Sequence, residues 1–212
     1  MFFRKARNKV FCIGRNKTGT TSIASALSEL GYRIGHQPAA ELLMEDWAAR
    51  DFRAIVRLCQ TADAFQDVPF SLDYTFQIVD HAFPGSQFVL TVRNSAQDWY
   101  DSLVRFHASL FGKTTPPTVE DLMHCDYCRP GWLWRQQQLV YGADETNLYN
   151  PDLYMAHYNS HISRVQDYFK YRARDLLILD VSDANAMQYL CNFLGIAHEG
   201  QAMPHLNRSG ND

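Results

Sequence analysis

Short apolar runs alternate with longer amphipathic stretches along the chain. Three runs are apolar at nearly every position: residues 10–13, 87–92 and 176–181. Continuous apolar runs of this length are typical of strands that are buried on both faces of a sheet. Two weaker strands are predicted at residues 32–35 and in the middle of residues 61–68, the latter ending near Asp67.

The longer stretches place apolar residues three or four positions apart, which is the spacing of an amphipathic helix. At residues 20–30, for example, Ile23, Leu27 and Leu30 fall on one face, and Gly31 ends the helix. The same spacing predicts helices at residues 39–44, 49–59, 72–82, 95–110, 151–171 and 184–194. Residues 118–150 are rich in Trp, Tyr and Gln, and their weaker periodicity predicts no definite element.

Strands that alternate with helices predict an α/β fold, in which helices flank a central, mostly parallel sheet in three layers. We expect a single domain over residues 1–212, with residues 112–150 as a candidate substrate cap within it. Ligands of such sheets bind at the carboxyl ends of the strands. Five polar residues fall at or just after predicted strand ends: Lys17, His36, Asp67, Arg93 and Asp180. We expect them to converge on one edge of the sheet.

The composition is that of an ordinary globular protein. Hydrophobic residues make up 46% of the 212 positions, charged residues make up 20%, and the formal net charge is −3. This balance argues against nonspecific binding to nucleic acid or to an acidic membrane surface. No apolar run approaches the ~20 residues that span a bilayer, and the basic start lacks the apolar core of a signal peptide. We expect a cytoplasmic protein, and the oligomeric state stays open.

The sequence contains no metal motif with complete ligand spacing. Cys125 and Cys128 form a single C-x-x-C without a second pair of ligands nearby. His157 and His161 stand four positions apart on a predicted helix but lack the Glu of H-E-x-x-H. We expect structural or incidental roles for both pairs, and no bound metal.

The most specific chemistry lies in residues 14–22, between the first strand and the first helix. The first N–H groups of a helix have no backbone partner, and the helix dipole adds partial positive charge, so anions bind there. Gly14 and Gly19 fit the two glycines of the Walker A pattern, but Thr20 occupies the position of its Lys. The Lys of this loop is Lys17, three positions earlier than in that pattern. We expect an anion-binding loop that differs from that of nucleotide triphosphatases.

The run from Lys17 to Thr21 resembles the 5′-phosphosulfate loop of the sulfotransferase family, which reads roughly Lys-[Ser/Thr]-Gly-Thr-Thr. Residues 91–103 are similar to the segment in which that family holds the 3′-phosphate of PAPS (3′-phosphoadenosine 5′-phosphosulfate) with an Arg and a later Ser. The Arg is Arg93; the family's usual spacing of eight falls on Asp101, whereas Ser102 is nine residues away.

Weaker matches extend the resemblance over most of the chain, at residues 63–69, 83–85, 161–194 and 203–208. The resemblance implies a compact bacterial-type sulfotransferase with a P-loop-type fold. It assigns cofactor binding to Arg15, Asn16, Lys17, Thr18, Gly19, Thr20, Thr21, Ser22, Arg93 and Ser102.

The resemblance implies transfer of a sulfuryl group from PAPS to a hydroxyl or an amine, with the desulfated nucleotide PAP as product and no metal. Lys17 would neutralise the charge that develops as the 5′-phosphate leaves. Asp67 is the first candidate for the general base, because its Asp-Val-Pro matches the place of a catalytic His in many family members. His36 is the second candidate and His107 the third.

The acceptor is a small molecule or a glycan whose class the sequence leaves open. Aromatic residues of the segment that would cap the site suit an apolar or ring-bearing alcohol, although such residues also build cores. These are Phe106, Phe111, Tyr127, Trp132 and Trp134.

Two other functions fit parts of the sequence. Residues 176–180 resemble the strand that ends in the Mg²⁺-binding Asp of an ATP-dependent kinase or phosphotransferase, but the displaced Lys17 argues against it. The second is a catalytically silent protein of the same fold that binds a nucleotide. Tight binding of PAP without Mg²⁺ would favour sulfotransfer, and binding of ATP with Mg²⁺ would favour a kinase.

Overall fold

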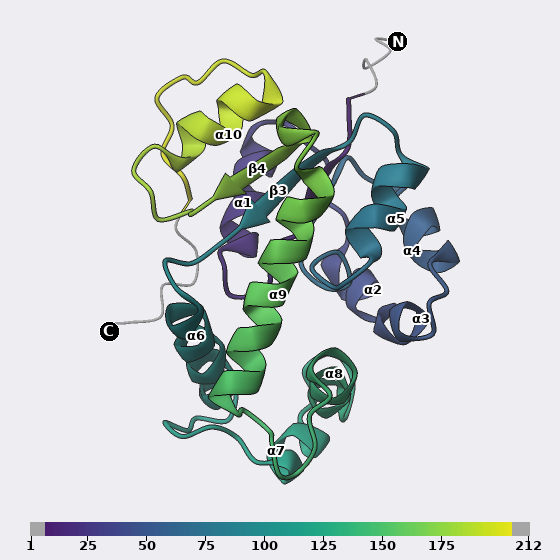
Figure 1. Cartoon of the computed structure of the whole chain (residues 1–212), viewed down its shortest axis with the longest axis vertical. Helices are drawn as coiled ribbons and strands as arrows, with labels where there is room; N and C mark the ends of the chain where they lie inside the picture. Colours follow the sequence, from purple (N-terminus) through teal and green to yellow (C-terminus); the bar gives the residue numbers. More distant parts are fainter. Residues whose placement is uncertain (1–6, 205–212) are drawn as a thin grey trace.

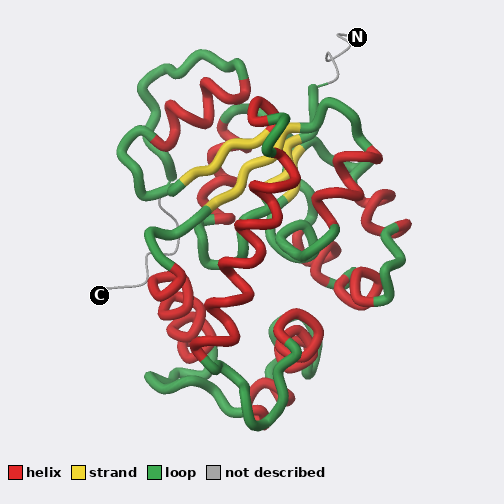
Figure 2. The backbone as a smooth tube through the Cα atoms, in the orientation of Figure 1, coloured by secondary structure: helices red, strands yellow, loops and turns green. Residues whose placement is uncertain are grey.

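The computed structural model describes residues 7–204, so the basic start of the chain and the resemblance at residues 205–208 lie outside the described residues. Four parallel strands form one sheet in the order β2-β1-β3-β4 (Figures 1 and 2). The strands are β1 (Val10–Cys12), β2 (Ala64–Phe65), β3 (Gln87–Thr91) and β4 (Leu176–Leu179). Parallel pairing brings the carboxyl ends of all four strands to one edge, as the alternation of strands and helices predicts.

Helices cover both faces of this sheet. Successive side chains of a strand point to opposite faces, so Phe11 and Phe88 pack on one side while Val10 and Val89 pack on the other. The first side is covered by α5 (Thr75–Ala82) and α9 (Pro151–Phe169), and the second by α1 (Thr20–Glu29) and α10 (Ala186–Leu194). Figure 1 shows α9 crossing in front of the sheet and α1 behind it. The predicted three-layer α/β architecture is confirmed.

The region between β1 and β2 differs from the prediction. The strand expected at residues 32–35 is only a single parallel bridge, between Ile34 and Ala64. The backbone of Gly35 lies against the Phe65 ring, where an added Cβ would come within 2.3 Å of the ring, and the chain then turns directly into a helix. The two helices expected at residues 39–44 and 49–59 are three short ones: α2 (Gln37–Glu41), α3 (Met44–Ala48) and α4 (Arg53–Leu58).

A group of helices continues below the carboxyl edge of the sheet in Figure 1. Here α6 (Ala96–Ser109) packs against α9, and α7 (Val119–His124) packs against α8 (Trp132–Tyr141). The periodicity of residues 118–150 did not predict α7 and α8, although local signals mark them: Thr118 caps α7, and Gly131 adopts a φ of 72° before α8. A short 3₁₀ helix, η1 (Ala173–Asp175), precedes β4. Within residues 7–204, the structure contains no helix with the length and apolar character needed to cross a membrane.

Candidate active site

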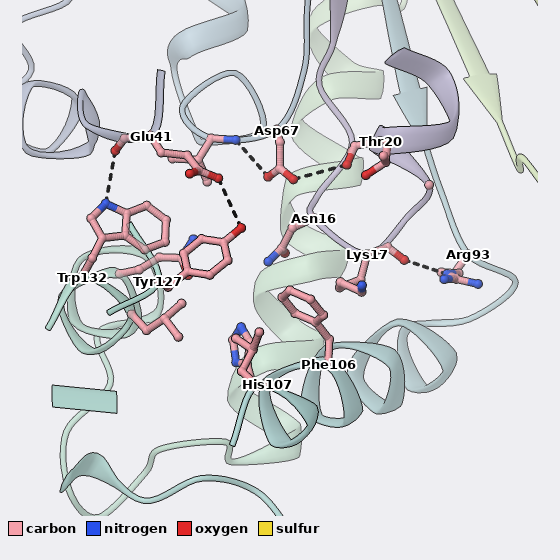
Figure 3. A pocket seen from close by; sticks show the side chains of 16 residues that line it. Asn16, Lys17, Thr20, Glu41, Asp67, Arg93, Phe106, His107, Tyr127 and Trp132 are labelled. Carbon is pink, nitrogen blue, oxygen red and sulfur yellow. Dashed lines mark hydrogen bonds between the residues drawn. The ribbon is translucent and has the colours of Figure 1, made fainter. Parts of the chain in front are cut away.

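A cavity of about 370 Å³ lies beyond the ends of β1, β2 and β3, between the sheet and the lower helices. Figure 3 shows its walls, which come from the loop after β1, from α2, from the segment after β2, and from α6, α8 and the turn between α7 and α8. The lining residues are Asn16, Lys17, Gly19, Thr20, Thr21, Glu41, Asp67, Val68, Arg93, Phe106, His107, Leu110, Tyr127, Trp132, Leu133 and Gln136.

The loop between β1 and α1 has a tightly constrained backbone. Gly19 adopts a φ of 97° at the N-cap of α1, and an added Cβ would lie 2.3 Å from a methyl of Val181. An added Cβ at Gly14 would lie 2.4 Å from the backbone oxygen of Thr91. Lys17 adopts a φ of 66°, which is uncommon for a residue with a side chain. The two glycines are therefore required sterically, and they bring the start of α1 to the cavity.

The side chains of this loop point in two directions. Asn16, Lys17, Thr20 and Thr21 line the cavity. Three other predicted cofactor residues of this loop are buried and do not line the cavity: Arg15, Thr18 and Ser22. Ser102, on α6, is also buried and does not line it.

The buried side chains hold the loop in place. Arg15 Nη2 donates a hydrogen bond to His157 Nδ1 at 2.8 Å and pairs with Asp73 at 3.5 Å. Thr18 Oγ1 donates to the backbone oxygen of Arg15 at 2.5 Å. His161 Nε2 donates to the backbone oxygen of Ile13 at 2.7 Å. His157 and His161 thus have structural contacts, and the Arg15 side chain is held by His157 and Asp73 outside the cavity lining.

Lys17 is the cation of the loop that faces the cavity. Its Nζ lies 3.9 Å from the centroid of the Phe106 ring, on α6. Burial lowers the pKa of Lys17, and the charge of Arg93 lowers it further, while Asp67 raises it. An ammonium group held over an aromatic face keeps a favourable contact while it is partly removed from water. Lys17 therefore presents a partly desolvated ammonium group to the cavity.

Arg93 connects the loop to α6. Its Nε donates to the backbone oxygen of Lys17 at 2.8 Å, and its Nη2 donates to Ser102 Oγ at 3.4 Å. Asp101 instead accepts a hydrogen bond from Gln97 at 2.8 Å. Of the two residues that the spacing after Arg93 left open, it is Ser102 that contacts the guanidinium.

Arg93 also borders a second hollow, of about 260 Å³, on the side of α6 and β4. The other residues of this hollow are Asn94, Asp98, Asp101, Arg105, Asp180 and Ser182. Arg93 lines both spaces, so one ligand could extend from the cavity past the guanidinium into the hollow.

Asp67 follows β2 and reaches the cavity next to the start of α1. Its φ is 58°; its Oδ2 accepts from Thr20 Oγ1 at 3.2 Å, and its Oδ1 accepts from the backbone N–H of Val68 at 2.9 Å. Burial raises the pKa of Asp67, while these hydrogen bonds and the charge of Lys17 act in the opposite direction. A carboxylate that is partly desolvated in this way is a better proton acceptor than one in water.

Glu41, at the end of α2, is a cavity residue that the sequence analysis missed. Burial raises the pKa of Glu41 to about 7, and the charge of Asp67 contributes to the shift. Its Oε1 accepts long hydrogen bonds, each of 3.5 Å, from Tyr127 Oη and Gln37 Nε2. Glu41 belongs to no motif, and it follows a helix start that the periodicity misplaced, so the sequence carried no signal for it.

The two candidate histidines have other contacts. His36 is exposed at the N-cap of α2, where its Nδ1 accepts from the backbone N–H of Ala39 at 3.2 Å, and it does not line the cavity. His107 does line it, but its Nδ1 lies 2.7 Å from Tyr149 Oη. Burial and the charge of Lys17 lower the pKa of His107 to about 3, so it is neutral and a weak base at neutral pH.

The structure brings together three of the five polar residues expected at the strand ends: Lys17, Asp67 and Arg93. His36 and Asp180 do not line the cavity; Asp180 Oδ1 accepts from the backbone N–H and the hydroxyl of Ser182.

Metal ligands do not gather at the cavity or elsewhere in the described part of the chain. Across residues 7–204, no group of three or more His, Cys, Asp or Glu side chains is arranged to hold a metal ion. Cys125 and Cys128 are half-buried free thiols on either side of Tyr127.

The chain matches the model of a known protein family. The family model described as "Sulfotransferase domain" matches residues 9–211, which include every residue that lines the cavity. No individual curated protein matches the chain.

Proposed function

Since this chain belongs to the sulfotransferase family, we propose that it transfers a sulfuryl group from PAPS to a hydroxyl or amine of a small-molecule or glycan acceptor. The observation that carries this proposal is that Lys17, Arg93 and the N-terminus of α1 meet in one cavity, with Asp67 beside them. A cationic cradle next to a desolvated carboxylate suits a reaction between an anionic donor and a proton-bearing acceptor.

The donor set of the cradle fits the two ends of PAPS. The first N–H groups of α1, the hydroxyls of Thr20 and Thr21, and the ammonium of Lys17 would hold the 5′-phosphosulfate. Arg93 and Ser102, which contact each other, would hold the 3′-phosphate, because a guanidinium can pair with two oxygens of one phosphate. The hollow beyond Arg93 leaves room for the rest of the nucleotide.

PAPS supplies a sulfuryl group that is activated by its bond to a phosphate leaving group. Lys17 would neutralise the negative charge that develops on that phosphate, and its place over Phe106 limits the movement of its ammonium. Asp67 would take the proton of the acceptor, since its carboxylate lies between the start of α1 and Glu41 in Figure 3. His36 has no part in this proposal, because its side chain caps α2.

The cavity thus has two sides. We call Lys17, Gly19, Thr20, Thr21 and Arg93 the donor side, and Glu41, Tyr127, Trp132, Leu133 and Gln136 the acceptor side. Three of the acceptor-side residues belong to α8 and a fourth to the turn before it, which supports a role for residues 112–150 as a substrate cap within a single domain.

Calorimetric titrations with PAP and with ATP, each with and without Mg²⁺, test the function. We expect PAP to bind at micromolar concentration or tighter without Mg²⁺, because the cradle supplies its own cations. Binding of ATP that requires Mg²⁺, together with no binding of PAP, would contradict the proposal and favour a kinase. Binding of PAP without turnover of PAPS across a panel of phenols, alcohols, sugars and amines would indicate a catalytically silent protein.

A further inference from the structure

The acceptor side of the cavity has a carboxyl group, that of Glu41, and no cation of its own. Among the residues that line the cavity, the two with cationic side chains are Lys17 and Arg93 on the donor side, and the described Lys and Arg side chains form no ion pair with Glu41 or Asp67. Figure 3 shows Glu41, Tyr127 and Trp132 grouped across the cavity from Lys17. A donor with a phosphosulfate and a 3′-phosphate would use the charges of Lys17 and Arg93, so Glu41 needs a partner from elsewhere.

The carboxyl group of Glu41 is only weakly satisfied by the protein. Its two side-chain hydrogen bonds, from Tyr127 Oη and Gln37 Nε2, are both 3.5 Å long, against about 2.7–3.0 Å for well-formed bonds. A partly buried carboxylate with long hydrogen bonds retains capacity for a stronger donor. Burial and the nearby charge of Asp67 raise its pKa to about 7, which is consistent with a carboxyl group that lacks a cation.

Two aromatic residues, Tyr127 and Trp132, contact Glu41. The Tyr127 and Trp132 rings lie 5.7 Å apart at 34° to each other, and Trp132 Nε1 donates to the backbone oxygen of Glu41 at 3.2 Å. Aromatic faces attract ammonium groups, most strongly where water is partly excluded. A carboxylate in an aromatic-lined part of the cavity therefore favours a cation over a neutral group, and it repels an anion.

We propose, on the basis of the proposed sulfotransferase function, that the acceptor is a phenol or alcohol that also carries a protonated amine. The ammonium pairs with Glu41 beside Tyr127 and Trp132, and the hydroxyl lies at Asp67. The hydroxyl oxygen forms the new bond to sulfur as the bond from sulfur to the 5′-phosphate oxygen breaks. The hydroxyl proton passes to Asp67, and PAP leaves with the electron pair. The ammonium is not the nucleophile, because its lone pair holds a proton.

The test uses three phenols that differ in the charge of one side chain: 4-(2-aminoethyl)phenol, 4-ethylphenol and 3-(4-hydroxyphenyl)propanoate. Trans-4-aminocyclohexanol and cyclohexanol extend it to alcohols. Release of PAP from PAPS gives kcat/KM for each acceptor. We expect each amine to exceed its neutral partner by about 10-fold or more, with the anion lowest; a 10-fold ratio corresponds to about 1.4 kcal/mol of transition-state stabilisation.

Glu41→Gln keeps the shape of the side chain and removes its charge, so we expect the ratio of amine to neutral acceptor to fall to near one. Glu120→Gln, an exposed position on α7, is the matched control and should keep the wild-type ratio. A neutral acceptor equal to its amine in the wild type, or an unchanged ratio in Glu41→Gln, would overturn the inference.

Calorimetry decides the case in which none of these acceptors turns over. The amine and neutral phenols are titrated into the protein saturated with PAP, and the amine should bind about 10-fold more tightly in the wild type but not in Glu41→Gln. Equal affinities would overturn the inference while leaving the proposed function intact. Loss of PAP binding in Glu41→Gln would indicate a damaged fold, and Glu41→Ala and Tyr127→Phe would then be titrated in its place. Failure of the wild type to bind PAP would count against the proposed function itself.

Discussion

The two sides of the cavity are built in different ways. The donor side comes from one short loop and the start of α1, with Arg93 as its single distant member. The acceptor side joins the end of α2 to α8, which is about 90 residues away along the chain; Trp132 Nε1 reaches the backbone oxygen of Glu41 across this separation. Chemistry shared by a family can reside in a compact backbone motif, whereas the choice of acceptor depends on contacts between distant segments.

The two sides also differ in charge. The donor side carries the cationic groups of Lys17 and Arg93, whereas the acceptor side carries the carboxyl group of Glu41, with Asp67 beside the boundary. In the proposed reaction, this separation keeps Lys17 available for the donor phosphate and Asp67 available for the acceptor proton. Substitutions that alter one side at a time test this difference.

Lys17→Ala removes the central charge of the donor side and should have the largest effect. We expect turnover of PAPS to fall by about 100-fold or more, because the leaving phosphate loses its cation, while binding of PAP stays measurable. PAP release and calorimetry measure the two quantities. Lys170→Ala, an exposed lysine paired with Asp167, is the control. Near-normal turnover in Lys17→Ala would remove this residue from the mechanism.

Asp67→Asn tests the proposed general base, which lies at the boundary between the donor side and the acceptor side. We expect kcat to fall by about 100-fold, since the amide cannot accept the proton, whereas the affinity for PAP should change by less than about threefold. Asn tolerates the φ of 58° at this position and can still accept from Thr20, so the fold should be kept. An unchanged kcat at saturating acceptor would assign the base elsewhere, with Glu41 the next residue to test.

Arg93→Ala should weaken donor binding rather than catalysis. We expect the dissociation constant of PAP to rise by about 10- to 100-fold, with kcat at saturating PAPS reduced much less. Arg57→Ala, on the exposed face of α4, serves as the control in the same calorimetric titration. Unchanged affinity would show that the 3′-phosphate lies away from this guanidinium.

Glu41→Gln should have a smaller effect than the three substitutions above, and the effect is on the pH dependence of the free energy of unfolding. Because the folded-state pKa of Glu41 is raised to about 7 from 4.5, the native protein retains a proton that the unfolded chain has released. The contribution of Glu41 to stability is therefore lost as the pH rises from about 4.5 to 7. We expect the wild-type free energy of unfolding to fall by about 2 kcal/mol more than that of Glu41→Gln across this window, as measured by urea denaturation. Parallel pH profiles would mean that Glu41 has an ordinary pKa.

The loop and the sheet were predictable because their signals are local. Apolar runs predicted β1, β3 and β4, a weaker signal in residues 61–68 predicted β2, and Gly14 and Gly19 marked the loop between β1 and α1. The prediction of a strand at residues 32–35 was wrong, because pairing with β2 ends after one bridge at Ile34. Spacing alone also left Ser102 and Asp101 as alternatives, since the rotation of α6 decides which of them faces Arg93.

The order of polar and apolar residues by itself determined the α/β class, the glycine-containing loop between β1 and α1, and the place of Arg93 after a strand end, because each depends on neighbours in sequence and on steric limits of the backbone. Tertiary structure alone decided which side chains enter the cavity. Arg15 is buried and contacts His157, and His36 caps α2. Glu41 lies next to Trp132 of α8 and Tyr127 of the turn before it. These outcomes depend on the packing of helices that are distant in sequence, and no local pattern encodes the direction in which a side chain finally points.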